Sequence, residues 1–333
     1  MAALLAIAPG AAPARRSAER EGGHDPITTK VTFDREIRAI LQTRCAGCHT
    51  AGGPAPMPLT TYEDVRPWAR SIKDQVLTRR MPIWHAAHGY GAFANDPSLT
   101  PVEMAIFAAW VDGGLPRSPG NSTPAPISTP VVSAFRRNAT PLSIPAVAAT
   151  ATVTLASPWI AAWDFEPGDP LVTSATFTSA GGAAIGTWVA GDAAVTLPAG
   201  AGLAVRSPVR VTVQRRNAAD YEKPYTPTRS VLYVVPLTDA PARRVWLEQS
   251  ACGAPRTRPN ADLLAVRPLL AGGASARLWL ERPGAPRAIL GWFRDTDARY
   301  PRAYWLTRAA DLPPESRVQS DTPCSVELTL ASR

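Results

Sequence analysis

The chain has 333 residues, which is enough for two or three domains of ordinary size. Hydrophobic residues make up 45% of it and charged residues 19%, so most of the chain is predicted to bury a core. Its net charge of +8 is spread along the chain without a run of Lys and Arg, and so does not predict nucleic-acid binding. The 35 prolines and 23 glycines favour a β-rich, turn-rich protein that contains a linker.

Residues 1–29 are predicted to be a signal-like or disordered N-terminus. Residues 2–14 form a short apolar stretch that ends in Ala12-Pro13-Ala14, close to the small-x-small pattern of a signal cleavage site. A basic segment before it is missing, so an irregular Ala/Pro-rich tail is the alternative. No later run approaches the about 18 apolar residues of a membrane span, and we therefore expect a soluble, exported chain.

The first predicted helix begins near Thr32 and ends at a C-x-x-C-H motif. Ile37, Ile40 and Leu41 follow at helical spacing, which places Cys45-Ala46-Gly47-Cys48-His49 at the helix end. Two thiols at this spacing can add to the two vinyl groups of one haem, and His49 then reaches the iron from the proximal side. The motif therefore predicts one covalently bound haem c.

Two other uses of the thiol pair fit the sequence less well. A redox dithiol is typical of a βαβ context, which is missing around Cys45. A zinc site needs a second pair of ligands nearby, and the other two cysteines lie far along the chain. Because c-type haem is attached outside the bacterial cytoplasm, the motif also indicates a periplasmic or exported protein.

The pattern after the motif alternates loops and helices. A Gly/Pro-rich loop over 51–58 precedes a predicted helix over 62–78, and a proline-stiffened loop, Arg80-Met81-Pro82-Ile83-Trp84-His85, follows. Thr100-Pro101-Val102-Glu103 is a capping box with proline at the first helical position. It predicts a last helix that Gly113-Gly114 closes.

This order resembles a class I cytochrome c domain over residues 30–117. Residues 54–114 are more narrowly similar to the haem domain fused to bacterial copper type II monooxygenase-like proteins. The resemblance implies a small all-α cytochrome c domain, with a distal methionine ligand on the loop before the last helix. Met81 occupies that loop.

Other side chains remain candidates for the distal position. A thioether sulfur favours ferrous iron and raises the reduction potential, so Met57, on the earlier loop, is the competitor of Met81. His85 or His88 would lower the potential, although a loop histidine is more often exposed or hydrogen-bonded. Met104 lies within the last helix and is expected in the core.

Residues 118–144 read as a Pro/Ser/Thr-rich linker, and residues 145–333 as an all-β region. The linker contains no lasting periodicity. Beyond it, short alternating or β-branched runs are separated by turn residues, and they predict two successive, jelly-roll-like β-sandwiches. These runs cover residues 209–213, 230–235, 244–247, 276–280, 289–293, 303–307 and 325–330.

The β region resembles the copper-binding part of peptidylglycine-hydroxylating monooxygenases, but without its ligands. The segment 163–172 looks like the entry to the first copper site, where Thr173-Ser174 replaces a His-His pair. Gln214 lies about where the third histidine should be. At the second copper, Leu269-Leu270-Ala271 replaces the His-x-His, and the late methionine has no counterpart.

The positions of histidine and methionine in the chain also indicate that the β region lacks copper ligands. The chain contains four histidines and four methionines, and all of them lie before residue 105. Copper in an N/S site needs imidazole or thioether ligands. We therefore expect no copper and no monooxygenase activity. Neither a Ser/His/Asp triad nor a phosphate loop is present in the β region.

Cysteines and clustered charges in the β region lead to three further expectations. Cys252 and Cys324 are expected to form a disulfide in an oxidising compartment. The acidic group Asp164, Glu166 and Asp169 lacks the pattern of a calcium loop and is expected to be solvated. A small basic cluster, more often a solvated strand face than an anion site, comprises Arg206, Arg210, Arg215 and Arg216.

The sequence thus predicts a multidomain protein, in which a small all-α cytochrome c domain precedes an all-β region. We expect a periplasmic electron-transfer protein rather than an enzyme, with no small-molecule substrate and no nucleic-acid partner. The β region would dock the protein on a redox partner protein or a membrane redox complex. One alternative is a haem enzyme or gas sensor with an openable, peroxidase-like distal site. The other is a haem-bearing structural subunit of a larger redox complex.

Overall fold

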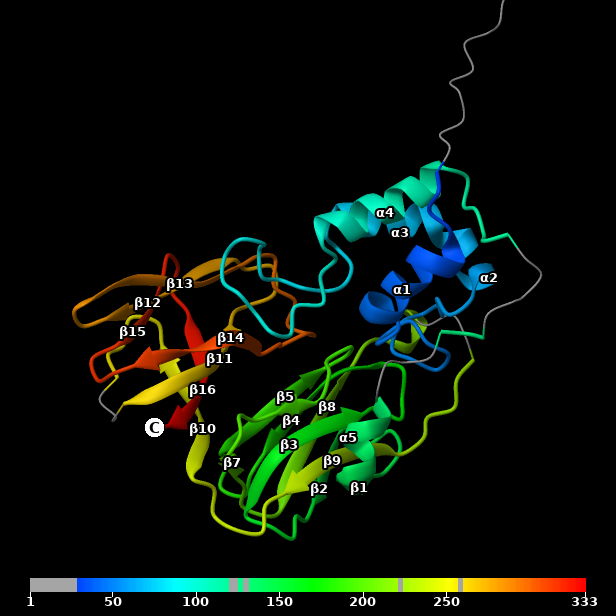
Figure 1. The fold of residues 1–333 in the computed structure, drawn as a ribbon. Helices are drawn as coiled ribbons and strands as arrows, with labels where there is room; N and C mark the ends of the chain where they lie inside the picture. Colours follow the sequence, from blue (N-terminus) through cyan, green and yellow to red (C-terminus); the bar gives the residue numbers. More distant parts are fainter. Residues whose placement is uncertain (1–28, 120–124, 128–131, 221–223, 257–259) are drawn as a thin grey trace, which may run out of the picture.

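The structure is a computed structural model that describes residues 29–119, 125–127, 132–220, 224–256 and 260–333 (Figure 1). The predicted signal-like stretch lies outside the described residues except for Thr29. No helix in the described ranges is long and apolar enough to cross a membrane.

Short helices occupy the N-terminal segment, in the places that the local sequence predicts. The first helical stretch is partly π-helical and comprises η1 (Phe33–Ile37), α1 (Arg38–Ile40) and η2 (Leu41–Cys45). The second comprises α2 (Tyr62–Val65), η3 (Arg66–Trp68) and α3 (Ala69–Leu77), and the third is α4 (Pro101–Asp112). Thr61 and Thr100 begin α2 and α4 with capping boxes. In each box the threonine hydroxyl accepts a hydrogen bond from the backbone N–H three residues later, and the carboxylate of that later residue accepts one from the threonine backbone N–H.

The prediction of a separate, small all-α domain is wrong. The structure is mostly β-sheet with few, short helices, and the loop between α3 and α4 pairs with strands of the β region (Figure 1). Within this loop, Ala86 and Phe93 form β-bridges with Phe293 and Leu306. The backbone N–H of Ala87 donates to the Trp292 carbonyl at 2.7 Å. Helical periodicity describes local structure only, so it could not reveal that a loop would pair with strands from the far end of the chain.

The β region is built from three sheets. One sheet has nine strands, in the order β1-β9-β3-β7-β10-β16-β11-β14 with β6 paired to β3, and the others are β2-β8-β4-β5 and β13-β12-β15. The strands are β1 (Thr140–Ile144), β2 (Thr150–Val153), β3 (Trp159–Glu166), β4 (Val172–Thr178), β5 (Ala184–Val189), β6 (Val195–Thr196), β7 (Ala201–Ala204), β8 (Val209–Arg215), β9 (Ser230–Pro236), β10 (Arg243–Ala251), β11 (Ala261–Leu269), β12 (Ala276–Arg282), β13 (Ala285–Phe293), β14 (Tyr304–Leu312), β15 (Arg317–Ser320) and β16 (Ser325–Ser332).

These sheets form two sandwich-like layers that share the large sheet. In the first layer, apolar side chains of β3 and β9 pack against those of β4, β5 and β8, as Phe165 does against Phe177. In the second, side chains of β11 and β16 pack against those of β12 and β13, with Leu278 and Phe293 fully buried. Because β7 pairs in parallel with β10, the layers are joined by one continuous sheet rather than being two independent sandwiches.

Part of the predicted linker is regular structure. The helix α5 (Val132–Asn138) and the strand β1 lie within 118–144, and the 3₁₀ turn η4 (Ala218–Asp220) follows β8. β1 is an edge strand of the large sheet, a position that tolerates Pro141 because an edge leaves one side of the ladder unpaired. Arg136 in α5 pairs with Asp164 and Glu166 of β3, which fixes the helix to the sheet.

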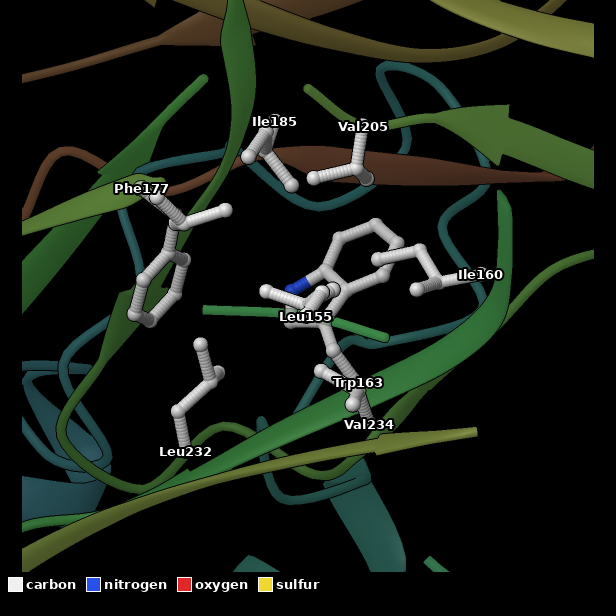
Figure 2. Close-up of a pocket in the computed structure, with 9 residues that line it drawn as sticks. Leu155, Ile160, Trp163, Phe177, Ile185, Val205, Leu232 and Val234 are labelled. Carbon is white, nitrogen blue, oxygen red and sulfur yellow. The ribbon is translucent and has the colours of Figure 1, made fainter. Parts of the chain in front are cut away.

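The core of the first layer encloses one small apolar cavity (Figure 2). Its volume is about 10 Å³, which is room for no more than one water molecule. The indole of Trp163 lies among the aliphatic side chains that line it, and Nε1 of Trp163 is buried without a hydrogen-bond partner in the described part of the chain. This cavity is too small for a ligand.

Candidate functional site

The C-x-x-C-H motif lies at the end of the first helical stretch, in one tight turn. η2 ends at Cys45, and the backbone N–H groups of Cys48 and His49 donate to the Cys45 carbonyl at 3.1 and 2.9 Å. This turn brings two half-buried thiols and one imidazole together, as the sequence predicts.

The imidazole of His49 is held in one orientation. Its Nδ1 lies 2.9 Å from the Met57 carbonyl, and the backbone N–H of Leu59 donates to the His49 carbonyl at 2.8 Å. A carbonyl can only accept, so Nδ1 carries the proton and the lone pair of Nε2 is left for a metal. Burial lowers the pKa of His49, against the opposing effect of the Met57 carbonyl, which keeps the ring neutral.

The two thiols are not poised for redox chemistry of their own. Burial raises the pKa of Cys45 to about 12, to which the neighbouring Cys48 adds, and burial raises that of Cys48 to about 11. An attacking redox thiol needs a lowered pKa, because the thiolate is the nucleophile. The environment therefore disfavours the redox dithiol among the alternatives.

Residues of the β region lie directly against the motif. Gly47 packs on the turn after β5, where a Cβ added to Gly191 would stand 2.7 Å from Sγ of Cys48. Gly191 also has φ +87°, a backbone conformation that favours glycine. Both this conformation and the nearby Cys48 sulfur therefore require glycine at position 191. The guanidinium of Arg216 donates to the Pro54 carbonyl in the loop after the motif, and to the Pro170 carbonyl at 3.1 Å.

A cavity of about 670 Å³ opens beside the motif, within the size range of small-molecule and cofactor sites. Thr43 and Arg44, which directly precede Cys45, form one part of its wall. The rest comes from the loop before α4, the turn between β5 and β6, and β14. Its polar and aromatic lining includes Asn95, Asp96, Asp192, Arg302 and Trp305.

Arg302, just before β14, joins several of these elements. Its guanidinium pairs with the Asp192 carboxylate at 3.1 Å and donates to the carbonyls of Ile83 and Ala190, each at 3.3 Å. It also lies over the Trp84 ring, 5.6 Å from the centroid. Burial raises the pKa of Asp192, against the opposing effect of Arg302.

The candidate distal ligands lie in different surroundings. The side chain of Met81 is 39% exposed, and no contact between it and Cys45, Cys48 or His49 is seen among the described residues. Met57 packs against the apolar cluster of the N-terminal helices.

The two loop histidines differ from each other. Nε2 of His85 is buried without a hydrogen-bond partner in the described ranges, and burial lowers the pKa of this ring. His88 is exposed, as expected of a loop histidine.

Two of the positions that the resemblance assigns to the first copper site lie side by side. Thr173 and Ser174 on β4 are buried, and Ser174 is the register partner of Gln214 on β8. The Ser174 hydroxyl lies 3.2 Å from Oε1 of Gln214. Leu269, which begins the replacement at the second site, is the last residue of β11. The first set thus forms a polar contact between neighbouring strands.

The structure contains the predicted disulfide between Cys252 and Cys324, with Cα atoms 5.3 Å apart. It joins the end of β10 to the start of β16.

The acidic side chains expected to be solvated are paired instead, whereas Arg206 and Arg210 of the basic cluster are exposed as expected. Arg215 binds the buried Asp169 at 2.8 Å, and α5 neutralises Asp164 and Glu166. No group of three or more His, Cys, Asp or Glu side chains arranged for a metal ion occurs in the described ranges.

Sequence reasoning missed Gly191, Asp192 and Arg302. They belong to no recognised motif, and Arg302 lies far along the chain from the loop it contacts. The available sequence signal is Arg216, two residues after Gln214, although a basic cluster there favours a solvated strand face.

Comparisons with known proteins identify no family for this chain. No family model matches the chain, and no curated protein matches it. Among solved structures, the chain is similar to the major capsid protein P2 of bacteriophage PM2, with 9% identity over 58% of this chain and 96% of that chain. The TM-score is 0.30, at which the likeness carries no argument about fold or function.

Proposed function

We propose that the protein carries one covalently bound haem c and transfers single electrons in the periplasm. The observation that carries this proposal is the His49 ring, whose Nδ1 is held by the Met57 carbonyl while Nε2 is left for iron, beside two half-buried thiols. A carbonyl that fixes the tautomer of a metal-binding histidine is a usual outer-shell partner. The donor set of two thiols and one neutral imidazole fits the covalent attachment of haem c.

Each residue of the motif has a defined role in this proposal. Cys45 and Cys48 would hold the haem through thioether bonds to its two vinyl groups, and His49 would bind the iron through Nε2. The Met57 carbonyl orients the imidazole and raises its basicity as a ligand. Haem supplies reversible one-electron chemistry when bound, and the protein positions it and limits its contact with water.

Met81 is the proposed distal ligand. Met57 holds Nδ1 of His49 through its own carbonyl and sends its side chain into the helical cluster, so it belongs to the proximal side. Met81 lies on the other loop, and its partly exposed thioether is free of the cores around it. A soft sulfur ligand favours the ferrous state, which suits an electron carrier.

The β region is proposed to be a docking or scaffold module related to copper monooxygenases. The contact between Ser174 and Gln214 supports this relation, because the resemblance assigns both positions to one copper site and they are register partners. Every histidine of the chain lies before residue 105, so this region offers no imidazole to copper. Its partner would be a redox protein or a membrane redox complex.

The test is carbon monoxide binding by the ferrous protein, produced in a host that attaches haem c. We expect a covalent haem adduct by mass spectrometry, a wild type that does not bind carbon monoxide, and a Met81→Ala variant that does. Met57→Leu is the matched control, and its ferrous form should not bind carbon monoxide. Absence of the adduct would refute the proposal. A wild type that binds carbon monoxide readily would favour an enzyme or gas sensor over an electron carrier.

A further inference from the structure

The strongest unexplained feature is a buried ion pair, Arg302 and Asp192, in the wall of the cavity beside the motif. The side chain of Arg302 is 6% exposed and that of Asp192 is 17% exposed. Taking two charges out of water is costly unless their geometry and other hydrogen bonds compensate. The pair meets this condition, because Arg302 also donates to two carbonyls and Asp192 accepts from the Val189 backbone N–H at 3.1 Å.

The contacts of Arg302 connect the β region to the loop of the proposed distal ligand. One nitrogen donates to the Ile83 carbonyl, two residues after Met81, and another donates to the Ala190 carbonyl on the turn that touches Cys48. The guanidinium plane also lies over the Trp84 ring. One side chain therefore holds the Met81 loop against the turn on which the C-x-x-C-H motif rests.

The same pair brings two opposite charges close to the motif. Asp192 directly follows Gly191, which packs on Gly47 and on Sγ of Cys48, and Arg302 donates to the Ala190 carbonyl on the same turn. Charges at a buried site interact with one another more strongly than they would in water. A positive charge there favours reduced haem, which carries one positive charge less than oxidised haem, and a negative charge favours the oxidised form.

We propose that Arg302 and Asp192 are positioning residues of the haem site, which rests on the proposed function. Arg302 fixes the Met81 loop through the Ile83 carbonyl, and the two charges together would set the reduction potential of a haem bound at the motif. The haem site is thus shared: the N-terminal segment supplies the covalent and axial ligands, and the β region supplies the charge and the support for the distal loop.

Substitutions that separate charge from support test this assignment by potentiometric titration of the haem. Asp192→Asn leaves Arg302 uncompensated and should raise the potential, whereas Arg302→Gln leaves Asp192 uncompensated and should lower it. The double variant should return towards the wild-type value, because the two effects share one interaction. Arg302→Lys keeps the positive charge but loses the paired hydrogen bonds to the Ile83 and Ala190 carbonyls. Its reduction potential should therefore stay closer to the wild-type value than that of Arg302→Gln, while its ferrous form should bind carbon monoxide.

Matched controls come from the buried pair Arg267 and Glu327, which are 2.7 Å apart between β11 and β16 and touch neither loop. Arg267→Gln and Glu327→Gln should leave the potential and carbon monoxide exclusion unchanged. Shifts of the same sign for Asp192→Asn and Arg302→Gln would overturn the proposal, since they indicate loss of structure only. No shift in either variant would overturn it too. A wild type without haem would instead refute the proposed function itself.

If Arg302→Gln fails to fold, Asp192→Asn still decides the question, because it leaves every contact between Arg302 and the carbonyls in place. Its circular dichroism spectrum and thermal midpoint should match those of Glu327→Gln. A raised potential in a folded Asp192→Asn supports the assignment, and an unchanged potential refutes it.

Discussion

The N-terminal helical segment and the β region differ in the size of their cores and in their content of histidine and methionine. The segment contains short helices around one apolar cluster, yet it holds every histidine and methionine of the described chain. The β region has two large cores and neither of these residue types. The difference shows that the chemistry is concentrated where the fold is least extensive. The loop between α3 and α4 connects the two, because it lies between helices in sequence and pairs with strands in space.

The largest effect expected from breaking this division is the loss of haem. The double variant Cys45→Ala/Cys48→Ala should contain no covalent haem, since no thiol remains at the motif, while the β region keeps its sheets and its disulfide. Intact-mass spectrometry and the β signal in circular dichroism report the two regions separately. A haem adduct that persisted in this variant would contradict the assignment of the motif.

The next largest effect concerns the β region alone. Removal of the disulfide in Cys252→Ala/Cys324→Ala frees a loop with a sequence separation of 72 residues. The free energy of unfolding should fall by roughly 2–5 kcal/mol, because the unfolded chain gains conformational freedom. Urea unfolding followed by tryptophan fluorescence measures this loss. The haem spectrum at low urea serves as the control and should not change, and a changed spectrum would show that the regions are more tightly coupled than we infer.

The smallest effect is expected from acid, and it has opposite signs in the two regions. Burial of Asp64 and Glu103 opposes their ionisation. Hydrogen bonds from Thr60 and Thr61 to Asp64, and from Thr100 and Arg44 to Glu103, outweigh it and lower both pKa values. Stability from a lowered pKa is present above the unfolded value, about 4 for a carboxyl group, and is lost as the pH falls through the folded one. Burial raises the pKa of Asp164 in β3, so protonation of that group favours the folded state instead.

We therefore expect the helical signal in circular dichroism to weaken before the β signal as the pH is lowered from 5 to about 3. Glu103→Gln should remove part of this pH dependence, because the amide still accepts from the Thr100 backbone but does not titrate in this range. Simultaneous loss of both signals in the wild type would contradict the separation of the two regions.

Local chemistry explains which features were predictable. The capping box at Thr100 predicted the start of α4 correctly, and the alternating runs at 209–213 and 276–280 lie within β8 and β12. The C-x-x-C-H turn needs only five consecutive residues. Periodicity, capping and motif spacing act within a few residues, so one sequence contains the whole signal.

The longer-range arrangement was not predictable in the same way. The helical pattern of residues 30–117 suggested an independent all-α domain, because nothing in the loop indicates that Ala86 and Phe93 will form bridges with strands β13 and β14. The parallel pair of β7 and β10 also turned two expected sandwiches into layers that share one sheet. Such pairings depend on which edges remain open after the sheets form, which local propensity does not encode.

The sequence by itself determined the chemistry of this protein: the thiols and the imidazole of the motif, the cysteines that form the disulfide, and a β region without histidine. Only the tertiary structure decided how these residues are supported. Arg302 donates to the Ile83 carbonyl across 219 residues of sequence, and Gly191 leaves the space that Cys48 occupies. The physical reason is that a covalent or ligand role depends on the type of side chain, whereas support depends on segments that meet only after the chain has folded.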